Sequence, residues 1–290
     1  MKNILIPTDF SSAAWNATEF ALHLFAEVEC KFYFLNAYTP EIYSNRLMAG
    51  GPIGKTKQCT AQKTSEKGLH NLVARIKKSY KNELHQYKKI STFSLLIEEV
   101  KELILKHKID FIIMGATGSA EDDALFMGRN AVRLLNTIDN CAVLTIPKNY
   151  KFRNLTSVAF ISDANYLYNG NELYPLINLC SVFKSTVHII NINEVPGYMT
   201  TLQKLNLETI DHKLENVPHH FYDVTIETSL AMALGTFIDQ TNCQLLVVSN
   251  NTNGFMKNLR VNFIVERSVF NTEVPILSLQ AKQNHIAISR

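Results

Sequence analysis

The chain has 290 residues, of which 46% are hydrophobic, 10% aromatic and 19% charged, and its formal net charge is +3. This composition is typical of a globular protein with a sizeable core and excludes a disordered or fibrous chain. The mild charge also argues against a nucleic-acid partner, whose phosphates usually require a dense basic stripe.

The strand-like and helix-like segments of the first half alternate, which predicts β/α units around a mostly parallel sheet. The predicted strands cover residues 3–7, 31–37, 90–95, 110–114 and 142–147. The predicted helices cover residues 11–27, 63–87, 98–107 and 131–138. The lysines of residues 77–89 are expected on the solvated side of a helix end.

The same order of segments begins again in the second half. Its predicted strands cover residues 157–162, 186–192, 222–227, 245–249 and 275–279. One predicted helix follows the first of these strands and ends at Phe183, and two more cover residues 230–239 and 259–269. The polar segment 148–154 lies between the two repeats. We therefore predict two domains, residues 1–149 and 150–290.

The five cysteines are far apart and have no CxxC spacing, which favours reduced thiols. The sequence has no apolar run of about 18 residues, the length of a membrane span, and its first residues do not resemble a signal peptide. We expect a cytoplasmic protein without a membrane partner.

Three glycines follow the fourth predicted strand at a spacing suited to an anion. Gly115 comes directly after the strand, Gly118 lies one turn further, and Gly128 precedes a helix. Backbone N–H groups and a helix N-terminus can converge on a phosphate there, although glycines also serve as ordinary turn formers. The segment GGPIGKT of residues 50–56 lacks the four-residue spacing of a P-loop and is predicted to be a surface lid or linker.

The sequence PTDFS of residues 7–11, together with the Gly-x-x-Gly-x9-Gly pattern, resembles the universal stress protein family. The resemblance spans the first half. It implies an α/β fold of tandem adenine-nucleotide-hydrolase-like domains, each with a five-stranded parallel sheet in the order 3-2-1-4-5, flanked by helices. Some members bind ATP, so the resemblance implies ATP or a related adenine nucleotide, with Mg²⁺, as a ligand.

The resemblance also implies which residues contact the nucleotide. Asp9 would lie near the ribose and adenine, Ala37 would offer its backbone to the adenine, and Met114, Gly115 and Gly118 would line the ribose and phosphate path. The full set is Pro7, Thr8, Asp9, Ala37, Met114, Gly115, Gly118, Gly128, Arg129 and Asn130. A carboxylate that steadies the following helix is an alternative role for Asp9.

The chain departs from the family pattern at the phosphate. Gly128 would begin the phosphate-binding helix, but Arg129 and Asn130 follow it where binding members have Ser or Thr. Arg129 would either pair with a phosphate or fill the pocket. The acidic residues 121–123 would repel a triphosphate unless Mg²⁺ intervenes.

The second half departs further. Ser249 and Thr252 stand where the first two glycines would be, Gly254 remains, and Asp163 is the counterpart of Asp9. A Cβ at the glycine positions would crowd a phosphate. We expect this half not to bind ATP in the manner of the family and to pack against the first half as an internal pseudo-dimer, with a homodimer left open.

No metal site and no catalytic residue are nominated. The histidines and carboxylates of residues 211–223 match no common metal-site spacing, and no GxSxG elbow is present. Trp15 is expected to pack in the core or at an interface.

Two functions remain open from the sequence. One is nucleotide-regulated binding of protein partners in a stress response, and the other is a nucleotide-free interaction scaffold of the same fold. An enzyme of the wider nucleotide-handling group is disfavoured, and ATP hydrolysis, if any, is expected to be slow.

Overall fold

The computed structural model describes residues 1–38, 55–118, 127–162, 164–193, 199–225, 230–250 and 274–280. The first half contains the strands β1 (Lys2–Pro7), β2 (Cys30–Tyr38), β3 (His85–Phe93), β4 (Phe111–Gly115) and β5 (Ala142–Ile146) and the helices α1 (Ser12–Leu24), α3 (Lys55–Ser79), α4 (Leu96–His107) and α5 (Arg129–Thr137). The second half contains the strands β6 (Ser157–Ser162), β7 (Thr186–Asn193), β8 (His219–Thr225), β9 (Leu245–Asn250) and β10 (Ile276–Gln280) and the helices α6 (Gly170–Phe183), α7 (Thr201–Lys213) and α8 (Leu230–Thr241).

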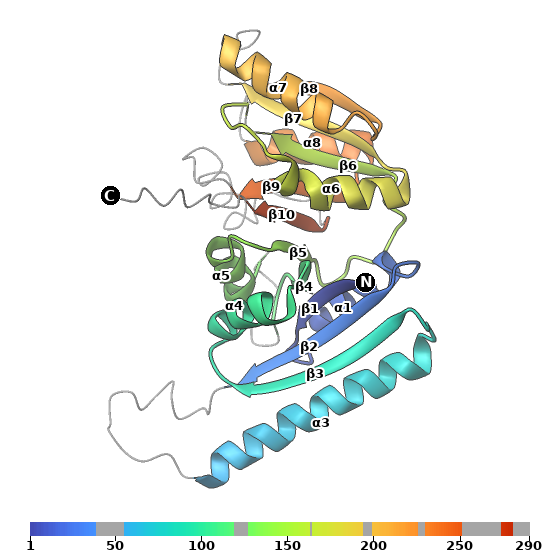
Figure 1. Ribbon diagram of the computed structural model, residues 1–290, viewed down its shortest axis with the longest axis vertical. Helices are drawn as coiled ribbons and strands as arrows, with labels where there is room; N and C mark the ends of the chain where they lie inside the picture. Colours follow the sequence, from blue (N-terminus) through green and yellow to red (C-terminus); the bar gives the residue numbers. More distant parts are fainter. Residues whose placement is uncertain are drawn as a thin grey trace, which may run out of the picture.

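Within these residues, the strands form one ten-stranded sheet in the order β3-β2-β1-β4-β5-β10-β9-β6-β7-β8 (Figure 1). The neighbouring strands of each half run parallel. Counted within its own half, each set of strands has the order 3-2-1-4-5, which confirms the predicted fold. Strands β5 and β10 pair antiparallel at the seam between the halves.

Helices cover both faces of the sheet, so alternate strand residues face two separate hydrophobic layers. One layer joins Ile4 and Ile6 to apolar residues of α1, α3, α6 and α7. The other joins Leu5 to apolar residues of α4, α5 and α8. Burial on both faces explains why the central strands read as nearly continuous apolar runs.

A serine side chain caps the start of α1. Ser11 is the N-cap, and its Oγ accepts a hydrogen bond from the backbone N–H of Ala14 at 3.1 Å. A serine at this position satisfies one of the N–H groups that have no acceptor inside the helix. The cap therefore fixes the point where the chain leaves β1 and enters α1.

The boundaries around β3 were predicted wrongly. A helix was expected to reach residue 87, but α3 ends at Ser79 and β3 begins at His85. Lys88 and Lys89 therefore lie on an edge strand and not at a helix end. The strand HQYKKISTF has mostly half-buried or exposed side chains because it lies at the edge of the sheet, so its sequence lacks a strong apolar pattern. Lysines are common on such edges, where they discourage pairing with other chains.

The third strand of the second half was placed at residues 222–227, whereas β8 covers His219–Thr225. The helix α7 was not predicted. Thr200 and Gln203 form a capping box at its start, with Thr200 Oγ1 accepting from the Gln203 N–H at 3.2 Å. The predicted helix of residues 259–269 and residues 50–54 of the predicted lid or linker lie outside the described residues. Lys55 and Thr56, the last two residues of that predicted linker, instead begin α3.

The buried His85 predicts how stability depends on pH. Its Nε2 donates to the Phe25 carbonyl at 2.9 Å, while its Nδ1 is buried without a partner in the described part of the chain. Burial lowers the pKa of His85 from its ordinary value of 6.5, and the hydrogen bond to Phe25 offsets this only in part.

The unfolded chain therefore binds a proton more readily at this position than the folded chain does. We expect the free energy of unfolding to fall as the pH drops below about 6.5, by at most about 1.4 kcal/mol per pH unit from His85. Urea unfolding measured between pH 7.5 and pH 5.5 (roughly one unit either side of the histidine pKa) checks this. The variant His85→Gln should show a shallower pH dependence, and an equally steep dependence would contradict the assignment to His85.

Candidate functional site

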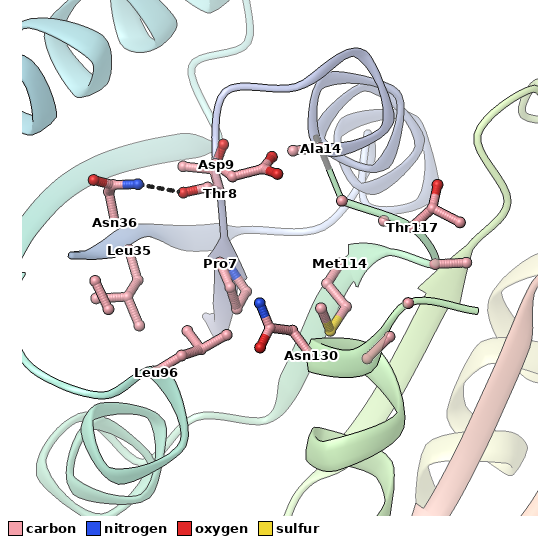
Figure 2. Close-up of a pocket in the computed structure, with 16 residues that line it drawn as sticks. Pro7, Thr8, Asp9, Ala14, Leu35, Asn36, Leu96, Met114, Thr117 and Asn130 are labelled. Atoms are coloured by element: carbon pink, nitrogen blue, oxygen red, sulfur yellow. Dashed lines mark hydrogen bonds between the residues drawn. The ribbon is translucent and has the colours of Figure 1, made fainter. Parts of the chain in front are cut away.

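A pocket opens at the carboxyl ends of β1, β2 and β4, where ligands commonly bind in parallel α/β sheets. The pocket is open to solvent, and its empty space, counted together with the solvent at its mouth, is about 650 Å³. Its lining residues are Pro7, Thr8, Asp9, Ala14, Leu35, Asn36, Ala37, Leu96, Met114, Gly115, Ala116, Thr117, Gly118, Gly128, Asn130 and Ala131 (Figure 2). Every predicted site residue except Arg129 therefore lines one pocket.

The end of β1 is held rigidly against β2. The Thr8 N–H donates to the Leu35 carbonyl at 2.8 Å, and Asn36 Nδ2 donates to the Thr8 carbonyl at 2.7 Å (Figure 2). These two hydrogen bonds involve both backbone groups of Thr8. This wall of the pocket is therefore held in place by hydrogen bonds within the protein. The sequence analysis did not name Asn36, although its position directly after a buried strand run was a usable signal.

The chain turns sharply after Thr8. Thr8 Oγ1 accepts from the Phe10 N–H at 3.0 Å, and Asp9 Oδ1 accepts from the Ser11 N–H at 3.0 Å. Phe10 has a φ of 64°, which is unusual for a bulky residue. Asp9 thus steadies the start of α1, the alternative role considered for it, and its exposed carboxylate also lines the pocket.

Gly115 has a packing role that the spacing of the glycines did not reveal. A Cβ on Gly115 would lie 3.0 Å from the carbonyl carbon of Ala13 and 3.1 Å from its oxygen. Because these are backbone atoms of α1, they cannot move independently of the helix. Glycine at this position lets α1 pack closely on β4.

Two backbone donors of the glycine loop are already used within the protein. The Ala116 N–H donates to the Ile146 carbonyl at 2.8 Å, and the Gly128 N–H donates to the Ala116 carbonyl at 2.7 Å. Gly128 is the N-cap of α5 and has no side chain with which to cap it. The N–H groups of α5 that have no acceptor inside the helix therefore lie in its first turn, beyond Gly128.

The charge of the pocket is set by few groups. Asp9 has the only ionisable side chain among the described lining residues. Arg129, the first residue of α5, is exposed and does not line the pocket. Asn130, the next residue, does line it, and Figure 2 shows its amide extending from α5 toward Pro7.

Serines stand at two corresponding strand ends of the second half. Ile161 of β6 pairs with Val248 of β9, so Ser162 and Ser249 follow on neighbouring strands. Both hydroxyls are buried and without a hydrogen-bond partner in the described part of the chain. The other predicted positions of this half, Asp163, Thr252 and Gly254, lie outside the described residues, as do the acidic residues 121–123.

The histidine-rich segment shows pairs of ionisable groups. His219 Nε2 lies 2.9 Å from Asp211 Oδ1, and His212 Nδ1 lies 3.8 Å from Glu215 Oε2. In the searched part of the chain, no three such side chains come together as a metal site. Likewise, none of the described helices is both long and apolar enough to cross a membrane.

The parallel strands in the order 3-2-1-4-5, flanked by helices, define an α/β fold that is present twice in one chain. The sequence profile described as the universal stress protein family matches residues 1–147. The chain therefore belongs to the universal stress protein family. No curated protein matches it.

Several solved structures resemble the whole chain. A universal stress protein from Archaeoglobus fulgidus DSM 4304 has a TM-score of 0.66 at 16% identity, with 96% of each chain covered. A putative universal stress protein from Pseudomonas aeruginosa UCBPP-PA14 has a TM-score of 0.58 at 12% identity, covering 97% of this chain and 93% of its own. A functionally unknown protein from Pseudomonas aeruginosa PAO1 has a TM-score of 0.57 at 12% identity, with 97% and 92% covered. These likenesses show the fold over both halves.

Proposed function

We propose that the pocket of the first half binds an adenine nucleotide and that its occupancy regulates contacts with protein partners in a stress response. The observation that carries this proposal is that residues from separate segments converge on one open pocket: residues 7–9, residues 35–37, residues 114–118, and Gly128 with Asn130 and Ala131. Family membership is consistent with it. The protein would act by binding and not by catalysis, in the cytoplasm.

The lining residues support one orientation of the ligand. Leu35, Ala37 and Leu96 form an apolar part of the pocket that suits a flat base. Asp9 would accept hydrogen bonds from the ribose hydroxyls. The N-terminus of α5, with its partial positive charge, would face a phosphate beside Gly118, with Mg²⁺ as a counterion.

The two halves would form the internal pseudo-dimer, with domain boundaries at residues 1–149 and 150–290. The connector between β5 and β6, residues 147–156, contains the proposed boundary. A homodimer of the whole chain is compatible with this arrangement. Neither a nucleic acid nor a membrane is proposed as a partner.

A nucleotide-free scaffold is the second candidate function. It is favoured by the internal use of the Ala116 and Gly128 N–H groups, and by the absence of Arg129 from the pocket lining. In that case the pocket would have no ligand to respond to, and partner binding would be constitutive.

Filling the pocket with a larger side chain distinguishes these functions. The variant Asn130→Phe places a ring where the amide now lines the pocket, and we expect it to weaken adenine-nucleotide binding by at least about tenfold, because the ring competes with the ligand for space. Titration calorimetry with adenosine, AMP and ATP, each with excess Mg²⁺, measures this.

The matched control is Asn136→Phe, on the exposed side of the same helix and outside the pocket. It should bind like the unmodified protein. If the unmodified protein gives no binding heat with any of the three ligands at millimolar concentration, the scaffold function replaces the nucleotide-regulated one.

A further inference from the structure

The two edge strands of the sheet differ in how well they resist pairing with another chain. In the order of the described strands, β3 ends the sheet on one side and β8 ends it on the other (Figure 1). An edge strand presents backbone N–H and C=O groups that can pair with a strand of another molecule. We propose that β8 pairs with the β8 strand of a second copy of this chain, so that the two sheets continue into one.

The backbone of β8 presents its outward groups at alternate residues. Val187 of β7 lies opposite His219, and the Val187 N–H donates to the Pro218 carbonyl at 2.8 Å. Backbone groups of successive strand residues point to opposite sides, so the even-numbered residues of β8 bond toward β7 as Pro218 does. The N–H and C=O groups of His219, Phe221 and Asp223 therefore point away from β7. Among the described strands, β8 pairs only with β7.

These outward groups are self-complementary in the antiparallel direction. A two-fold axis at Phe221 places this residue opposite its own copy and places His219 opposite Asp223. Each of these is a pair that exchanges two backbone hydrogen bonds, because all three residues point outward. A two-fold axis is also the commonest symmetry of a homodimer, in which both copies contribute the same surface. The strand HHFYDVT can therefore pair with itself along its outward groups.

The side chains that meet in this register are compatible. Phe221 is a large apolar residue that is 41% exposed, and the same residue of the second copy would cover it. His219 would lie opposite a carboxylate, and it already contacts Asp211 Oδ1 at 2.9 Å. Asp223 accepts from Asn191 Nδ2 at 2.9 Å, and a carboxylate can accept several hydrogen bonds. Aromatic pairs and pairs of unlike charge stabilise strand pairing, and this register sets no like charges opposite each other.

A shift of the register loses this match. With the two-fold axis at Tyr222 instead, the outward groups still pair, but Phe221 lies opposite Asp223. An aromatic ring then faces a carboxylate, and neither side chain finds the partner that suits it. The side chains therefore favour the axis at Phe221.

The edge strand β3 does not offer the same match. The Cys30 N–H of β2 donates to the Leu84 carbonyl at 2.9 Å, so the odd-numbered residues of β3 point outward. A two-fold axis at either Lys88 or Lys89, the central part of this strand, sets two lysines opposite each other. Like charges directly opposite each other destabilise a strand pair. The interface is therefore assigned to β8 and not to β3.

Sedimentation velocity of the full chain over a range of concentrations tests the proposal. We expect a monomer–dimer equilibrium. The variant Phe221→Lys sets two lysines opposite each other at the axis, and Phe221→Glu sets two glutamates there. Each variant alone should raise the dissociation constant of the dimer at least about tenfold. An equimolar mixture of the two should associate at least about tenfold more tightly than either alone, because a lysine then faces a glutamate.

The matched control is Phe93→Lys, because Phe93 lies on the other edge strand and is 40% exposed. It should leave the dissociation constant unchanged. A chain that stays monomeric at every concentration would overturn the proposal, as would a control that weakens the dimer as much as Phe221→Lys. If Phe221→Lys tightened the dimer, or if the mixture associated no better than the single variants, the axis at Phe221 would be wrong. None of these outcomes depends on nucleotide binding.

Discussion

Replacing Gly115 by valine is expected to lower the free energy of unfolding by about 3 kcal/mol, the upper part of the range for groups forced into a packed core. The new Cβ alone would lie 3.0–3.2 Å from three atoms of Ala13, two of which belong to the backbone. Relief would require α1 to move away from β4, which would loosen the layer that both elements share. Urea unfolding followed by far-ultraviolet circular dichroism measures the loss.

The matched control for this variant is Gly170→Ala, at the first position of α6. A Cβ there would have no heavy atom within 4 Å. Its stability should change by less than about 0.5 kcal/mol, or rise slightly because alanine restricts the unfolded chain. If Gly115→Val proved as harmless as this control, the close packing of α1 on β4 would not be what requires glycine.

The position of the pocket could be predicted from the sequence, but the packing and hydrogen bonds that shape it could not. The sequence placed Thr8, Ala37 and Gly115 at the ends of predicted strands, and the pocket lies at that edge of the sheet. The reason for glycine at position 115 depends on where Ala13 lies, and no spacing rule gives the distance between two elements so far apart in the chain. For the same reason, the hydrogen bond from the Gly128 N–H to the Ala116 carbonyl could not be predicted from the sequence.

The fold was predictable where burial is strong and was mispredicted where it is weak. The central strands β1, β4 and β6 are buried on both faces, so their apolar runs identified them. The helix α7 was missed because Leu202 and Leu205 are 59% and 56% exposed, so its apolar residues do not follow a single buried stripe. The edge strand β3 was displaced in the prediction because its apolar residues Tyr87, Ile90 and Phe93 recur every third residue, as on a solvated helix.

The seam between the halves links their stability. Leu144 of β5 pairs with Leu277 of β10, and both residues lie in the hydrophobic layer that contains α1 and α6. The two halves therefore share one hydrophobic layer across the pair of strands β5 and β10, which lie side by side in Figure 1. If the core is shared, a substitution that destabilises one half should also destabilise the other half.

We expect Leu277→Ala to destabilise the whole chain by about 2–5 kcal/mol, the usual cost of truncating a fully buried leucine. Trp15, the single tryptophan, lies on α1 in the first half, with its ring 3.5 Å from the Arg75 guanidinium. Its fluorescence therefore reports on the half that does not contain the substitution. The urea midpoint seen by Trp15 should fall as much as the midpoint seen by circular dichroism.

Leu105→Ala is the control, since Leu105 on α4 is 74% exposed and its truncation should cost less than about 0.5 kcal/mol. The halves would unfold independently if the urea midpoint of Trp15 fluorescence did not change while circular dichroism showed part of the helical signal lost at lower urea. The antiparallel pairing of β5 with β10 would then be a contact between two autonomous domains. Equal shifts would instead make the ten-stranded sheet one cooperative unit, because only a shared core transmits the loss of Leu277 to α1.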